Sequence, residues 1–164
     1  MVGDPMTYIE KVRGFNAAPH RQENATECGT RRPTVLVIED GQELSDSFRN
    51  VGECLGLTIA HVPSHEDLAA MLSLHCPMAV VAEMDAAGQD GCHVLMTIAG
   101  HDEELPVLLI AGEDPMVLGA IDAVQEIWQL ASVTKWPRVQ GIGAIVDFLF
   151  HAGRSGGCMR LMPV

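Results

Sequence analysis

The chain has 164 residues, of which 48% are hydrophobic and 20% are charged, a balance that predicts one globular domain and excludes a disordered, collagenous or coiled-coil chain. The formal net charge of −12 excludes nucleic acid and anionic membranes as favoured partners, because both are polyanions. No apolar run approaches the roughly 20 residues of a membrane-spanning helix, and the N-terminus lacks the basic start and apolar stretch of a secretory signal, so we expect a cytoplasmic protein.

The first predicted element is a strand that begins just after Pro33. Residues 1–32 show no sustained hydrophobic period and are expected to form a flexible N-terminal tail. Residues 34–38 are a continuous, largely β-branched run, typical of a strand buried on both faces of a parallel sheet. Apolar residues then recur at the spacing of one helix face, at Leu44, Phe48, Val51 and Leu55. Gly56 is expected to end that helix.

The same alternation of strand and helix continues to the C-terminal region. Further strands are predicted over residues 57–62, 78–82, 106–110 and 131–134. Helices are predicted after a capping box at Ser64 and Asp67, around residues 94–98, after Asp114 and Pro115, and from Gly141 to just before Gly153. Residues 152–164 are expected to be a C-terminal tail, which leaves one domain over residues 33–151.

Strands that alternate with helices predict an α/β domain with a parallel sheet and helices on both faces. We therefore expect a doubly wound five-stranded sheet with the strand order 2-1-3-4-5. In such sheets ligands bind beyond the carboxyl ends of the strands, so the residues that follow the strands are the candidates for a site.

Three carboxylates and one ammonium group follow these strands and are expected to converge: Glu39, Asp40, Glu83 and Lys135. Carboxylates packed together repel one another unless a cation offsets them, so either a divalent ion or the lysine is needed among them. Hard oxygen ligands favour Mg²⁺, and the three carboxylates are its candidate ligands.

These residues resemble the acidic pocket of receiver domains in two-component response regulators, the CheY-like family with a flavodoxin-like fold. The run Val37-Ile38-Glu39-Asp40 is similar to the acidic pair after their first strand, and Lys135 to the lysine after their fifth. Residues 80–91 follow the third strand and its loop without a gap. In that family an aspartate after the third strand accepts a phosphoryl group from a histidine kinase, with Mg²⁺ on the acidic pair. The resemblance makes Glu83 the equivalent of that phosphoacceptor.

The sequence departs from the family pattern at further positions. The resemblance places Ala111 where receivers carry the Ser or Thr that binds phosphate, and Ser132 where they carry a mobile aromatic residue. Trp136 separates the lysine from Pro137, and Ala87 replaces the usual loop proline. Two explanations stay open: drift after loss of phosphate chemistry, or mimicry of the phosphorylated state by Glu83, which carries less charge than a phosphate.

The resemblance implies a stand-alone signalling module, a pseudo-receiver that acts by binding a protein, independently of phosphorylation, without enzymatic activity and with no required cofactor beyond a possible Mg²⁺ ion. Its partner would be a histidine kinase, an output protein or a regulator, and a homodimer stays open. Trp128 and Trp136 are candidate contact residues, with Trp136 expected to be the more exposed and Phe148 expected in the core.

Two alternatives stay open beside this interpretation. One is a receiver that still accepts a phosphoryl group on a displaced carboxylate, Asp85 or Asp40. The other is an unrelated doubly wound enzyme, against which the absence of a glycine-rich phosphate loop and of a nucleophile elbow argues.

Overall fold

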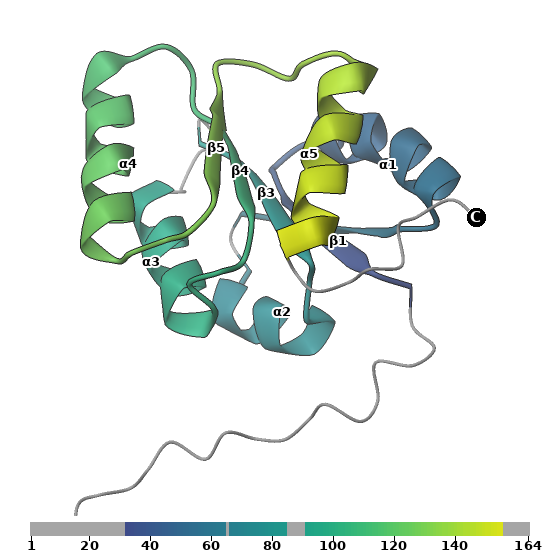
Figure 1. Ribbon diagram of the computed structural model, residues 1–164, viewed down its shortest axis with the longest axis horizontal. Helices are drawn as coiled ribbons and strands as arrows, with labels where there is room; N and C mark the ends of the chain where they lie inside the picture. Colours follow the sequence, from purple (N-terminus) through teal and green to yellow (C-terminus); the bar gives the residue numbers. More distant parts are fainter. Residues whose placement is uncertain (1–31, 65, 85–90, 156–164) are drawn as a thin grey trace, which may run out of the picture. The chain divides into compact units, whose positions relative to one another are not determined.

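The computed structural model describes residues 32–64, 66–84 and 91–155, and over these residues strands and helices alternate along the chain (Figure 1). The strands are β1 (Thr34–Ile38), β2 (Thr58–Val62), β3 (Ala79–Glu83), β4 (Val107–Ile110) and β5 (Val133–Trp136). The helices are α1 (Glu43–Leu55), α2 (Leu68–His75), α3 (Gly91–His101), α4 (Pro115–Ile127) and α5 (Ile142–Ser155). The predicted α/β alternation is confirmed.

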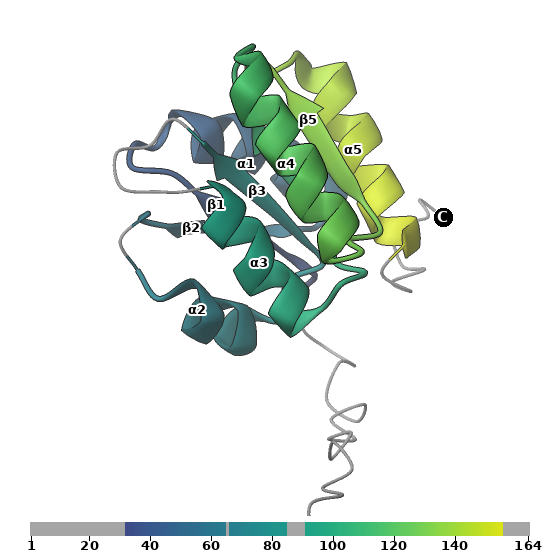
Figure 2. The ribbon, with the colours of Figure 1, turned by 90° about the vertical axis from the view of Figure 1, so that its left-hand side faces the viewer.

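The strands form one parallel sheet in the order β2-β1-β3-β4-β5. Helices α1 and α5 cover one face of this sheet, and α2, α3 and α4 cover the other (Figures 1 and 2). The prediction of a doubly wound sheet with order 2-1-3-4-5 is therefore confirmed.

Alternate residues of the central strands supply the two halves of the core. In β1, Leu36 and Ile38 pack under α2, α3 and α4, whereas Val35 and Val37 pack under α1 and α5. Each of these four side chains is at most 1% exposed. A strand buried on both faces needs an unbroken apolar run, which is the pattern that residues 34–38 show.

The helix ends follow local chemistry. Gly56 ends α1 with a left-handed φ of 70°, a conformation that costs glycine little. Asp114 caps α4 by accepting a hydrogen bond from the Met116 N–H at 2.9 Å, with Pro115 in the first turn, as predicted. The predicted capping box before α2 is wrong in one respect. Asp67 is the N-cap of the helix, whereas the Ser64 hydroxyl donates a hydrogen bond to Asp40.

Two element boundaries differ from those predicted. Strand β5 spans Val133–Trp136 instead of 131–134, so Lys135 lies within the strand and not after it. Helix α5 continues to Ser155, through Gly153, because its buried face extends to Ala152 and Gly153. Within the described ranges, no helix combines the length and apolar character needed to cross a membrane.

The tail predictions for residues 1–31 and 156–164 fall outside the described residues, as do Asp85 and Ala87 in the loop after β3.

Candidate functional site at the carboxyl edge of the sheet

The two central strands end at the same level and bring two glutamates to one edge of the sheet. Ile38 at the end of β1 pairs with Ala82 of β3, so the next residue of each strand, Glu39 and Glu83, stands at the same height. Glu39 is buried, Glu83 is half-buried, and Asp40 is exposed. The parallel register thus explains why the sequence could predict an acidic edge.

Glu39 holds the N-terminus of α1. One of its carboxylate oxygens accepts a hydrogen bond from the Leu44 N–H at 2.9 Å, and the other accepts one from the Ser45 N–H at 2.7 Å. The N-cap residue Gln42 makes no side-chain capping bond, so Glu39 satisfies two otherwise unpaired donors of the first turn. The helix dipole also favours a negative charge there. Sequence reasoning missed this role, although the lack of a Ser, Thr, Asp or Asn cap was the available signal.

Asp40 is bound from the neighbouring strand. Ile38 pairs with Val62, so the residues two positions beyond each, Asp40 and Ser64, meet above the sheet. The Ser64 hydroxyl donates a hydrogen bond to Asp40 Oδ1. Asp40 therefore sits beside β2, at the side of the acidic edge away from β4 and β5.

The side chains of Lys135 and Trp136, which are neighbours in β5, lie on opposite faces of the sheet. Trp136 packs on the α1–α5 side, and successive side chains of a strand alternate between faces, so Lys135 lies on the α4 side. There its ammonium group forms an ion pair with the Asp122 carboxylate of α4. Asp122 lies two turns into the helix that starts at Pro115, and no sequence signal marked it as a partner.

Ala111 and Ser132 are held by main-chain bonds. The Ala111 N–H donates to the Trp136 carbonyl at 2.9 Å, and the side chain is 2% exposed. The Ser132 carbonyl accepts a hydrogen bond from the Val107 N–H at 2.9 Å. Ala111 therefore places a buried methyl group directly after β4, beside β5, and has no hydroxyl that could bind a phosphate.

The carboxylate oxygens at this edge match the chemistry of Mg²⁺, but Glu39, Asp40 and Glu83 do not come together as one group of three ligands. In the part of the chain that the structure describes, no group of three or more His, Cys, Asp or Glu side chains is placed to hold a metal ion. Both oxygens of Glu39 already accept helix N–H bonds. We therefore derive no chemistry through a metal ion here.

Comparison with known proteins relates the chain to bacterial regulators. No family model matches it. It is 27% identical over 94 residues to the C4-dicarboxylate transport transcriptional regulatory protein DctD of Rhizobium meliloti (strain 1021), and 30% identical over 91 residues to the protein of that name in Pseudomonas aeruginosa. These matches cover 57% and 56% of this chain, and the chain spans about a fifth of the length of both relatives.

Solved receiver structures match nearly the whole described fold. The chemotaxis response regulator CheY4 of Vibrio cholerae superposes with a TM-score of 0.60 at 10% identity, covering 74% of this chain and 99% of CheY4. The beryllofluoride-activated NtrC receiver domain superposes with a TM-score of 0.57 at 20% identity, and the match covers 80% of this chain and 99% of that domain. NtrX of Brucella abortus gives 0.61 at 17% identity, covering 79% of this chain and 28% of NtrX. This chain has the receiver-domain fold.

Within the receiver fold, the aromatic residues differ in exposure from what the sequence suggested. Phe148 of α5 is 7% exposed, as predicted, and its ring meets that of Trp136 edge-on at 6.4 Å between centroids. Trp136 is therefore half-buried on β5, and the prediction that it is the more exposed tryptophan is wrong. Trp128, which caps the end of α4, is 43% exposed.

Proposed function

We propose that this chain is a response-regulator-type signalling module that acts by binding another protein and accepts no phosphoryl group. The receiver fold and the similarity to two transcriptional regulatory proteins support a role in signalling. The observation that carries the phosphorylation-independent part is the ion pair between Lys135 and Asp122. It occupies the ammonium group that the resemblance assigns to the phosphate.

The other residues of the edge favour the same conclusion. Glu83 stands where the resemblance expects the phosphate-accepting aspartate. Glu39 is engaged as a helix cap, and Ala111 lacks a hydroxyl. Positioning of acceptor, cation and hydroxyl is what phosphoryl transfer depends on, and each part is replaced or engaged here.

The proposed module performs no enzymatic step and requires no cofactor. Its partner is another signalling protein of the cytoplasm, such as a histidine kinase, an output protein or a regulator, because the acidic surface disfavours nucleic acid and anionic membranes. Pairing of two copies is the second arrangement that the same module could adopt.

Intact-mass spectrometry tests the proposal. The protein is incubated with Mg²⁺ and a small phosphoryl donor, beside a receiver domain with an intact aspartate that shows the donor to be active. We expect no added phosphoryl mass on the wild-type chain. The double variant Glu83→Asp/Asp122→Asn restores an aspartate at the end of β3 and removes the ion-pair partner of Lys135. We expect this variant to gain one phosphoryl mass.

The competing phosphoacceptor hypothesis predicts the opposite result for the wild type. A gain of one phosphoryl mass that disappears in Asp85→Asn or in Asp40→Asn would overturn the proposal and assign the acceptor to that aspartate.

A further inference from the structure

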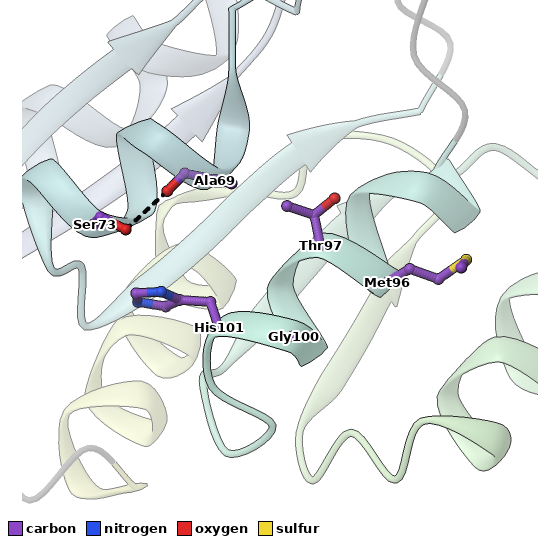
Figure 3. Close-up of a pocket in the computed structure, with 6 residues that line it drawn as sticks. All are labelled: Ala69, Ser73, Met96, Thr97, Gly100 and His101. Carbon is purple, nitrogen blue, oxygen red and sulfur yellow. Dashed lines mark hydrogen bonds between the residues drawn. The ribbon is translucent and has the colours of Figure 1, made fainter. Parts of the chain in front are cut away.

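A groove of about 370 Å³ lies between α2 and α3, away from the carboxyl edge of the sheet (Figure 3). Two residues of α2 and four of α3 line it: Ala69, Ser73, Met96, Thr97, Gly100 and His101. In Figure 3 the His101 ring extends from the last turn of α3 toward α2. The neighbouring helices α2 and α3 thus form an open groove on the face of the sheet that α2, α3 and α4 cover.

The groove is lined by small residues, by two residues with hydroxyl groups, by His101 and by one exposed apolar side chain, Met96. The Ser73 hydroxyl donates to the Ala69 carbonyl at 3.0 Å, and the Thr97 hydroxyl donates to the His93 carbonyl at 2.8 Å. These hydroxyls are satisfied within their own helices, so a partner need not supply bonds to them. Met96, which lines the groove, is 41% exposed, and Leu74, which follows the lining residue Ser73 in α2, is 65% exposed.

The segments that flank helices α2 and α3 in the sequence carry carboxylates, and neither these segments nor the two helices carry lysine or arginine. The sequence has no lysine or arginine between Arg49 and Lys135, so α2 and α3 and their flanking loops carry neither. Exposed carboxylates immediately precede α2 and follow α3: Glu66, Asp67, Asp102, Glu103 and Glu104. A groove that exposes the apolar Met96 side chain, with carboxylates at one end of each helix, is complementary to a ligand that is apolar on one side and cationic on the other.

We infer that the α2–α3 groove binds a cationic amphipathic helix of a partner protein. Apolar side chains of that helix enter the groove, and its lysines and arginines face the carboxylates beside α2 and α3. A helix suits the site because two packed helices leave a groove between their ridges that a third helix fits. This inference rests on the proposed function, binding of another protein, and specifies the surface and the chemical class of the ligand.

Two exposed glycines provide a matched pair of variants. A Cβ atom at Gly100 in the groove, or at Gly119 on α4, meets no atom within 4 Å, so both positions accept a side chain without a clash. Gly100→Arg fills the groove and adds a positive charge there. Gly119→Arg makes the same chemical change on α4, outside the groove.

The probes are a synthetic amphipathic helix of leucine and lysine and a peptide of the same length and pattern with glutamate in place of lysine. Titration is followed by amide NMR shifts and calorimetry at about 0.15 M salt, where long-range attraction is screened. We expect the lysine peptide to shift amides of α2 and α3 and the glutamate peptide to shift none. Gly100→Arg should weaken binding by about tenfold or more, and Gly119→Arg by about threefold or less.

Three results would overturn the inference: equal weakening by the two variants, shifts confined to other elements, or no binding of the lysine peptide. Such a result leaves the mass measurement on the phosphoryl group untouched. Conversely, phosphoryl uptake by the wild type would overturn the proposed function while the groove titration kept its outcome, so the two failures can be told apart.

Discussion

Glu39 combines two roles at the scale of a single residue, because it belongs to the acidic edge and also caps a helix. Its carboxylate is 2% exposed and accepts two N–H groups of the first turn of α1. A buried charge is costly unless it is hydrogen-bonded, and here the two bonds and the helix dipole offset that cost.

Removal of this carboxylate should therefore destabilise the protein. We expect Glu39→Ala to lower the free energy of unfolding by about 1–3 kcal/mol, because two buried N–H groups lose their acceptors. Glu39→Gln keeps one acceptor oxygen and should cost less. Urea denaturation of the two variants and the wild type measures the difference, and equal stability of Glu39→Ala and the wild type would contradict the capping role.

Lys135 shows how strongly a residue's role depends on where its strand ends. Its pair with Asp122 is partly exposed, with side-chain exposures of 29% and 60%, so the pair contributes little to global stability. Its importance lies in where it holds the ammonium group, on the α4 side of β5.

At the scale of the elements, helix α1 and strand β2 are in close contact at a glycine. A Cβ atom placed on Gly52 of α1 would lie 2.9 Å from both Cγ1 and Cδ1 of Ile59 in β2. The absence of a side chain at Gly52 allows the helix to approach the edge strand closely. Gly100 of α3 and Gly119 of α4 have no such neighbour.

Alanine substitutions at these glycines should separate packing from helix propensity. We expect Gly100→Ala and Gly119→Ala each to raise the free energy of unfolding by about 0.5–1 kcal/mol, since alanine is the better helix former. Gly52→Ala should lower it, because Ile59 must move. Combining Gly52→Ala with Ile59→Ala should turn the effect of the glycine substitution favourable, and chemical denaturation of the double-mutant cycle measures this. If Gly52→Ala raised the free energy of unfolding as much as Gly100→Ala does, the close-contact explanation would be refuted.

At the scale of the whole molecule, the net charge of −12 is the main electrostatic feature. The region between Arg49 and Lys135, which includes α2, α3 and α4, has carboxylates but no lysine or arginine of its own. Described ion pairs involve Arg49 with Asp46 and Lys135 with Asp122, one on each side of the sheet. Mutual repulsion of the remaining carboxylates opposes the compact state.

Screening of this repulsion should stabilise the protein. We expect the thermal unfolding midpoint to rise by roughly 2–5 °C between about 0.01 and 0.15 M sodium chloride. Glu103→Gln/Glu104→Gln removes two charges from the acidic loop after α3 and should show a smaller rise. Differential scanning calorimetry at fixed pH checks both, and a midpoint that falls with salt in the wild type would contradict a repulsion-limited stability.

The sequence by itself determined the order of strands and helices, the parallel doubly wound sheet and the acidic edge. It could do so because these features depend on hydrophobic periodicity and on the rule that parallel strands end together. Buried runs such as residues 34–38 carry that information over several consecutive positions, so an error of one or two residues at an end does not change the fold.

Only the tertiary structure decided which way the site residues face. A shift of β5 by two positions moved Lys135 into the strand, where strand alternation directs it toward Asp122 of α4. The capping bonds of Glu39 and the groove between α2 and α3 likewise arise from the packing of elements distant or staggered in the chain. Hydrophobic periodicity tells which residues are buried, but the partner of a polar side chain depends on register and helix placement, which no local pattern encodes.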